Sequence, residues 1–111
     1  MLIMTYAVYT LNVFEKKMDK LSYSDKEIIR KMFLQLKENP YVGDQIRYKF
    51  FREKRLRENR IYYLIYEDIS IVLVVAISGK KAQQETIDEI VKYFKEYRRY
   101  AERLSNPFNS P

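Results

Sequence analysis

The chain has 111 residues and a formal net charge of +6, from 21 lysines and arginines against 15 aspartates and glutamates. It contains no cysteine and no histidine. This excludes a disulfide framework, a metal site built on thiolate or imidazole, and a cysteine or histidine catalyst, and we expect neither a metal nor another cofactor. A basic balance favours a polyanionic partner such as RNA, DNA or a ribosome, or an acidic protein.

Length and hydropathy set further expectations. The length predicts one domain, residues 1–104, followed by a flexible tail over residues 105–111. The apolar first ten residues lack a basic leader and a cleavage site, so we expect no signal peptide. No apolar run approaches the length of a membrane span. The expected compartment is therefore the cytoplasm, without a membrane partner.

The first half of the chain predicts a strand followed by two helices. Residues 3–10 are rich in β-branched and aromatic side chains, which is typical of a strand. The second helix carries an apolar stripe and ends at Asn39, because a residue before proline is pushed away from helical angles. The two helices form a hairpin whose apolar stripe needs a sheet to cover it. Capping-box pairs predict the two helix starts, and they are Asn12 with Glu15 and Ser24 with Glu27.

The second half predicts three consecutive strands and a helix. Residues 47–56 are basic, residues 61–66 are rich in tyrosine, and residues 69–77 are almost wholly aliphatic. A strand that is apolar on both faces lies at the centre of a sheet, and short turns between strands indicate an antiparallel meander. Gly79 is expected to adopt a positive φ. Residues 83–104 keep the helical period throughout and predict one final helix.

Together these elements predict an α+β domain with the order β-α-α-β-β-β-α. We expect a four-stranded, mainly antiparallel sheet with the helical hairpin on one face and the C-terminal helix flanking it.

Most of the excess charge lies in one stretch. Between residues 47 and 60, seven lysines and arginines stand against two glutamates, a net charge of +5. Such concentration favours a binding site over a general solubility device. Alternation places Arg52 and Lys54 on one face and Arg55 and Arg57 on the other, so both rows cannot line one groove. The alternative is a solvated strand guarded against edge-to-edge pairing.

Three stretches resemble the RelE/ParE superfamily of type II toxin–antitoxin toxins. They are the loop at residues 39–41 that leads into the basic strand, the strand at residues 60–66, and residues 74–81, which end in Gly-Lys-Lys. The order of elements is similar over roughly residues 5–104. The resemblance implies this fold, a cytoplasmic setting and a cognate antitoxin. In the RelE branch it also implies a metal-independent, ribosome-dependent endoribonuclease that cleaves mRNA.

The resemblance also implies a site. Such nucleases use basic residues on the middle strands, an arginine at the corner after the last strand, and a tyrosine early in the final helix. By position, Lys81 corresponds to the corner arginine. Two positions depart from the pattern, since Ile87 stands at the expected tyrosine and Tyr63 stands where the second strand typically has arginine, for which Arg60 could compensate. The residues that correspond to the basic strand are Arg52, Lys54, Arg55 and Arg57.

Cleavage of RNA by its 2′-hydroxyl needs a proton acceptor, positive charge to stabilise the transition state, and a donor to the leaving oxygen. Without histidine, the candidate bases are Lys54 and Lys49, because nearby like charges favour a neutral amine. Arginines would hold the phosphate through paired donors. The predicted catalytic residues are Lys54, Arg55, Lys81 and Arg52. The predicted RNA-binding residues are Lys49, Arg57, Arg60, Lys80, Tyr62 and Tyr63.

Each assignment has a structural alternative. The tyrosines could serve cross-strand packing instead of stacking on bases, and Lys80 and Lys81 could form a solvated corner. The leading hypothesis is a RelE-like toxin whose partners are an antitoxin, the ribosome and mRNA. The alternatives are a ParE-like protein that acts by protein contact, which Ile87 favours, and an inactive nucleic-acid-binding module. An antitoxin would cover the cations with acidic residues and an amphipathic helix.

Overall fold

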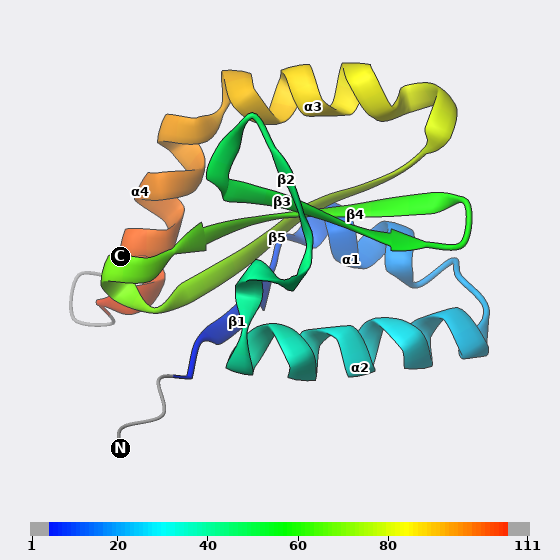
Figure 1. Ribbon diagram of the computed structural model, residues 1–111, viewed down its shortest axis with the longest axis horizontal. Helices are drawn as coiled ribbons and strands as arrows, with labels where there is room; N and C mark the ends of the chain where they lie inside the picture. Colours follow the sequence, from blue (N-terminus) through cyan, green and yellow to red (C-terminus); the bar gives the residue numbers. More distant parts are fainter. Residues whose placement is uncertain (1–4, 107–111) are drawn as a thin grey trace.

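A computed structural model describes residues 5–106 of the protein. Its middle layer is a five-stranded sheet in the order β1-β5-β4-β3-β2 (Figure 1). The helices α1 (Asn12–Met18) and α2 (Tyr23–Glu38) cover one face, and α3 (Gln83–Lys92) and α4 (Phe94–Ser105) cover the other. The strands are β1 (Ala7–Thr10), β2 (Asp44–Ile46), β3 (Tyr48–Leu56), β4 (Asn59–Tyr66) and β5 (Ile71–Gly79). Short 3₁₀ turns occupy η1 (Pro40–Val42), η2 (Glu67–Ile69) and η3 (Lys80–Ala82).

The α+β class and the antiparallel meander are confirmed, while the four-stranded sheet is wrong by one strand. β3, β4 and β5 pair antiparallel in sequence, and β1 joins β5 in parallel, with Ala7 opposite Ile71. The additional strand, β2, pairs antiparallel with β3 after a turn at Arg47, whose φ is 59°. A three-residue strand carries too little alternation to be separated in the sequence from the loop that leads into the basic strand.

The predicted final helix is two helices. Tyr93 leaves the helical conformation, with φ −107° and ψ 19°, and α4 turns from the line of α3 toward the end of the sheet where β4 meets β5 (Figure 1). The apolar period continues through this break because both segments cover the same face of the sheet. Periodicity alone therefore did not reveal the bend.

The helix starts also differ from prediction. The N-cap of α2 is Ser22 rather than Ser24, and the Ser22 hydroxyl accepts a hydrogen bond from the backbone N–H of Asp25 at 3.2 Å. The N-cap of α1 is Leu11, which makes no side-chain cap. The end of α2 at Glu38 agrees with the prediction from the following Asn-Pro pair.

The core has two apolar layers, one on each face of the sheet. β5 is buried on both faces, as predicted for a central strand, with Val72 and Val74 toward α1 and α2 and Leu73 and Val75 toward α3 and α4. In β4 the neighbouring tyrosines divide in the same way. Within residues 5–106, none of the helices combines the length and the apolar character that crossing a membrane requires.

The two glycines have roles other than the one expected. Gly79 has a φ of −77°, so the predicted positive φ is wrong, and positive values occur instead at Arg47, Arg57 and Ser70. A glycine is required at position 43 because there is no room for a side chain. A Cβ at this position would lie 2.4 Å from the Tyr63 hydroxyl oxygen and 2.7 Å from the Glu53 carbonyl oxygen.

Candidate functional site

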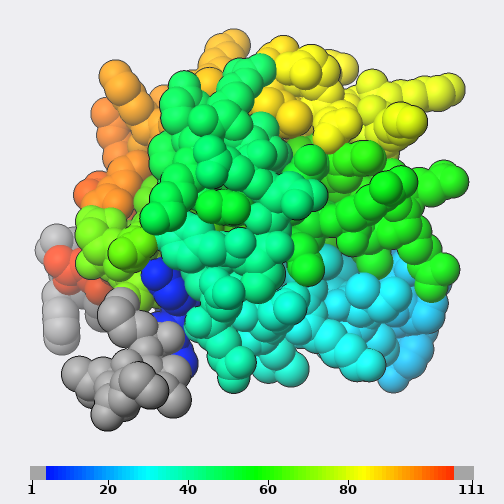
Figure 2. Space-filling view, in the orientation of Figure 1, coloured from blue at the N-terminus to red at the C-terminus, as the bar shows by residue number. Residues whose placement is uncertain are grey.

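Four of the predicted cations meet at the turn end of the β3–β4 hairpin, beside the start of α3. Arg55 of β3 lies directly opposite Arg60 of β4, and Arg60 lies opposite Ser78 of β5. Lys80 and Lys81 follow β5 at once in η3. These four cations line a hollow of about 620 Å³, which we call the cation corner. In Figure 2 the hairpin turn and the start of α3 project side by side at the right of the molecule.

The cations of the corner are largely uncompensated. Arg55, Lys80 and Lys81 are exposed, and none forms an ion pair with a carboxylate of residues 5–106. Glu58 also lines the hollow, and the Arg55 guanidinium donates a hydrogen bond to the Arg57 carbonyl at 3.1 Å. Unpaired cations around one hollow create a positive potential that suits a phosphate group.

The carboxylate of Glu53 lies next to the corner, on the same face of the sheet. Glu53 Oε2 is 3.6 Å from Arg60 Nε, and the Gln83 side-chain amide donates to the same oxygen at 3.2 Å. The side chains of Arg60 and Glu53 are 15% and 17% exposed. Arg60 Nη1 is buried without a hydrogen-bond partner among the described residues. A buried guanidinium donor without a partner is costly, so Arg60 is held at this position by its contact with Glu53 and by the surrounding sheet.

Arg52 lies on the opposite face of the sheet from the corner. It pairs across the ladder with Tyr63, which belongs to the layer under α1 and α2. Its guanidinium donates to the carbonyls of Lys49 at 2.9 Å and Gly43 at 3.1 Å, and it packs over the Tyr41 ring at 5.2 Å. Through these contacts Arg52 stabilises the β2–β3 hairpin.

Lys54 shares that face with Arg52. It lies opposite Ile61, in the layer under α1 and α2, and it lines a separate hollow against α2. The sheet therefore divides the predicted catalytic set. Arg55 and Lys81 lie together in the corner, and Arg52 and Lys54 lie on the opposite face of the sheet. Of the remaining cations, Lys49 packs over the Tyr41 ring at 5.3 Å, and Arg57 pairs with Asp25 of α2 at 2.7 Å.

The two candidate tyrosines are part of the core. Tyr62 and Tyr63 are both 0% exposed, so neither ring offers a face on which a base could stack. The Tyr63 hydroxyl donates to the Pro40 carbonyl at 2.6 Å and accepts from the Gly43 N–H at 3.0 Å, and burial raises its pKa to about 12. The Tyr62 hydroxyl shares a hydrogen bond of 2.9 Å with Ser78 Oγ, and burial raises its pKa as well. Both tyrosines therefore serve packing within the sheet, which was the structural alternative to stacking on bases.

Sequence reasoning missed Glu53 and Gln83. Glu53 was counted only as a reduction of the local charge, although its spacing from Arg55 places both on one strand face. The expected tyrosine position, Ile87, is 7% exposed and packs with Ile90 under α3. Within residues 5–106, no three histidine, cysteine, aspartate or glutamate side chains gather in a way that could hold a metal ion.

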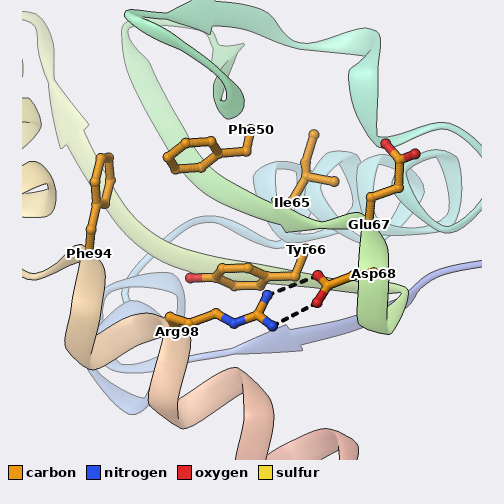
Figure 3. Close-up of a pocket in the computed structure, with 7 residues that line it drawn as sticks. All are labelled: Phe50, Ile65, Tyr66, Glu67, Asp68, Phe94 and Arg98. Atoms are coloured by element: carbon orange, nitrogen blue, oxygen red, sulfur yellow. Dashed lines mark hydrogen bonds and ion pairs between the residues drawn. The ribbon is translucent and has the colours of Figure 1, made fainter.

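A different hollow, of about 490 Å³, lies at the other end of β4 (Figure 3). Its walls include Phe50 from β3, Phe94 from α4 and the Tyr66 ring. Arg98 of α4 donates two hydrogen bonds to the Asp68 carboxylate, at 2.9 Å and 2.7 Å, and its guanidinium packs 5.4 Å from the centre of the Tyr66 ring. Three of the seven residues that line this hollow are aromatic, and its arginine, unlike the exposed cations of the corner, is paired with a carboxylate.

Fold and site together define a class of small α+β protein. A helical hairpin covers one face of the sheet, two further helices cover the other, and cations from two strands and the following turn share one corner.

Solved structures of RelE toxins have this fold. A doubly substituted E. coli toxin RelE in the free state matches with a TM-score of 0.67 at 22% identity, over 80% of this chain and 97% of that chain. The RelBE2 toxin–antitoxin complex from Mycobacterium tuberculosis matches with a TM-score of 0.60 at 18% identity, over 68% and 99%. The archaeal RelE–RelB complex from Pyrococcus horikoshii OT3 gives 0.60 at 17%, over 69% and 97%.

The chain therefore has a RelE-like fold, and the resemblance drawn from the sequence is confirmed at the level of the fold. Neither a protein-family model nor a curated protein sequence matches the chain.

Proposed function

We propose that the chain is a RelE-like toxin of a toxin–antitoxin pair, which binds mRNA on the ribosome at the cation corner and inhibits translation by cleaving it. The observation that carries the proposal is the corner itself. Cations from β3, β4 and η3 share one hollow, and three of them are exposed and unpaired within residues 5–106. The RelE-like fold supports the same conclusion.

In the proposed reaction the scissile phosphate lies among the cations of the corner. Arg55 and Lys81 stabilise the charge that grows on the phosphoryl oxygens as the 2′-oxygen attacks phosphorus and the 5′-oxygen leaves. Glu53 accepts the proton of the 2′-hydroxyl, and Lys80 or water returns a proton to the leaving oxygen. Glu53 replaces the sequence-based candidate Lys54 in this role because Lys54 lies on the other face of the sheet.

The test combines growth with a map of mRNA ends. Induction of the wild-type chain should arrest growth and produce primer-extension stops within translated mRNA. The Arg55→Ala/Lys81→Ala variant should do neither, whereas the control Lys37→Ala/Lys95→Ala removes the same charge outside the corner and should behave as wild type. Glu53→Gln should lose the stops and keep ribosome binding. Full toxicity of the Arg55→Ala/Lys81→Ala variant would reject the site.

A second candidate function is a ParE-like or catalytically inactive protein that acts by binding protein or nucleic acid. The buried Ile87, where a tyrosine is expected, favours it, because the corner then lacks a phenol. In that case growth arrest occurs without primer-extension stops, or RNA binds with a steep salt dependence and stays intact when ribosomes are added.

We also propose an antitoxin partner. The solved RelE structures include complexes with the antitoxin RelB. An acidic segment that covers the cation corner would neutralise this chain by competing with RNA phosphates for the same donors. In this proposal residues 1–104 act as one domain in the cytoplasm, where ribosomes and mRNA are found. Co-expression with the product of the neighbouring reading frame should restore growth.

A further inference from the structure

A second cationic hollow lies on the other side of β3 from the cation corner. It has a volume of about 410 Å³, and we call it the α2 hollow. Lys31 of α2 is exposed and Lys54 of β3 is half-buried, and neither is in an ion pair with a carboxylate of residues 5–106. The residues that line it are Ile28, Lys31, Met32, Gln35, Lys54 and Arg55.

The two hollows share Arg55, which lines both. They meet across an open stretch of strand edge. β2 pairs with β3 only as far as Asp44 opposite Glu53, so among residues 5–106 no strand lies on the outer side of residues 54–56 of β3. The cations therefore form one row over this edge, which runs from Lys31 and Lys54 through Arg55 to Lys81.

Protection of the strand edge does not explain this row. Charged side chains on an open edge discourage pairing with another chain, but that role requires charge only on the edge strand. Lys31 comes from α2 instead, and it lines the same hollow as Lys54. Lysines from two elements that share a hollow, with no carboxylate paired to either among the described residues, form a place where an anion is stabilised.

We propose that the RNA strand held in the cation corner continues over the edge of β3 at Arg55 and places a further phosphate in the α2 hollow, between Lys31 and Lys54. This inference rests on the proposed function, because the same RNA occupies the corner. The ligand is single-stranded, since a flexible strand can bend over an edge into two adjoining hollows, whereas a duplex is stiff over about 150 base pairs. The Gln35 amide, which also lines the hollow, provides a donor and an acceptor for a base or ribose.

The test measures the affinity of the full chain for 2′-O-methyl RNA, which cannot be cleaved by 2′-hydroxyl attack. An octanucleotide and a trinucleotide are titrated over a range of salt concentrations. The variants are Lys31→Gln/Lys54→Gln in the α2 hollow, Lys81→Gln in the corner, and the control Lys37→Gln/Lys95→Gln, which removes two exposed lysines that line neither hollow. Circular dichroism melting checks each fold, and the single variant Lys31→Gln, on an exposed helix position, serves if the double variant is unfolded.

For the octanucleotide, the α2-hollow variant should bind more weakly, with a salt slope smaller by about 0.7 for each lost phosphate contact. The control should keep the wild-type slope, and the trinucleotide should respond to Lys81→Gln alone. An α2-hollow variant that matches the control, while Lys81→Gln weakens octanucleotide binding, would overturn this inference and leave the corner in place. Absence of RNA binding by the wild type, or no effect of Lys81→Gln, would overturn the proposed RNA function and this inference together.

Discussion

The hydroxyl of Tyr63 holds the segment before β2 from inside the core. It donates to the Pro40 carbonyl and accepts from the Gly43 N–H, and both contacts are buried. Tyr63→Phe should therefore leave two backbone groups unsatisfied and lower the free energy of unfolding by about 1–3 kcal/mol, measured by urea denaturation. Tyr62→Phe is the matched control and should cost less, because Ser78 is only half-buried and can turn to water. Equal losses in the two variants would contradict this account.

The same residue makes the protein sensitive to alkaline pH. Burial raises the pKa of Tyr63 to about 12, against an ordinary value of 10.0. Below pH 10 the phenol is neutral in both the folded and the unfolded chain, so its contribution is constant. Between pH 10 and pH 12 only the unfolded chain ionises, and the free energy of unfolding should fall by roughly 2–3 kcal/mol. Urea denaturation at pH 8 and pH 11 should reveal a smaller fall in Tyr63→Phe than in the wild type.

Gly43 is the other residue on which this segment depends. Gly43→Ala would drive a methyl group into the Tyr63 hydroxyl and the β3 backbone, so we expect a loss of about 1–3 kcal/mol in the free energy of unfolding. Gly79→Ala is the control, because its nearest neighbour would be Asn59 Oδ1 at 3.9 Å and its φ is ordinary. A melting temperature of Gly43→Ala equal to that of Gly79→Ala would contradict the steric argument.

At the scale of elements, α3 and α4 are each tied to a loop or turn by an arginine–aspartate pair. Arg98 of α4 holds Asp68 in η2, and Arg47 in the β2–β3 turn holds Asp88 of α3 at 2.9 Å. Hydrogen bonds from these arginines lower the pKa of both carboxyls below their ordinary values. Both pairs are exposed, so they orient the helices more than they stabilise the fold.

This arrangement gives a site-specific prediction. Arg98→Gln should raise the pKa of Asp68 toward its ordinary value, and the pKa of Asp88 should stay low because Arg47 is untouched. Carboxyl chemical shifts followed by NMR between pH 2 and pH 7 would measure both. Amide exchange should also become faster in α4 than in α3. Unchanged Asp68 titration in the variant would mean that another group holds that carboxylate.

The elements that sequence predicted are those whose signal is local. The aliphatic β5, the tyrosine-rich β4 and the stop before Pro40 follow from neighbouring residues. The parallel partner of β5 and the short β2 could not be predicted, because one depends on residues far apart in the chain and the other spans three residues. The N-cap of α2 was misplaced because Ser22 and Ser24 are both good N-cap residues.

The candidate site was predicted in composition but not in arrangement. The basic stretch does carry the corner, yet the decision between Arg52 with Lys54 and Arg55 with its neighbours depends on strand register, where a shift by one residue exchanges the two faces. Phe51 and Leu56 fix that register, each on its own face. The position of Glu53 beside the corner could not be predicted, because it depends on contacts with Arg60 of β4 and Gln83 of α3.

For the whole molecule, the charge is distributed unevenly. The two hollows beside Arg55 hold cations without carboxylate partners among the described residues, whereas the aromatic hollow at the other end of β4 has its arginine paired with Asp68. We expect association with polyanions to be steered to the hairpin end and to weaken steeply with salt. Heparin-column elution should shift to lower salt for Arg55→Ala/Lys81→Ala more than for Lys37→Ala/Lys95→Ala, and equal shifts would mean that net charge alone governs retention.

The parallel pairing of β1 with β5 has a consequence for how the chain is made. β5 must find partners on both sides, one from residues 7–10 and the other from the hairpin just before it, so the sheet closes only after residue 79 has been synthesised. Lys80 and Lys81 come later still, and α3 and α4 must then cover the second face. Long-range pairing of this kind is slow to form. A nascent chain cannot assemble the corner until those residues have left the ribosome, so the cations of β3 and β4 are made before the turn that completes the hollow.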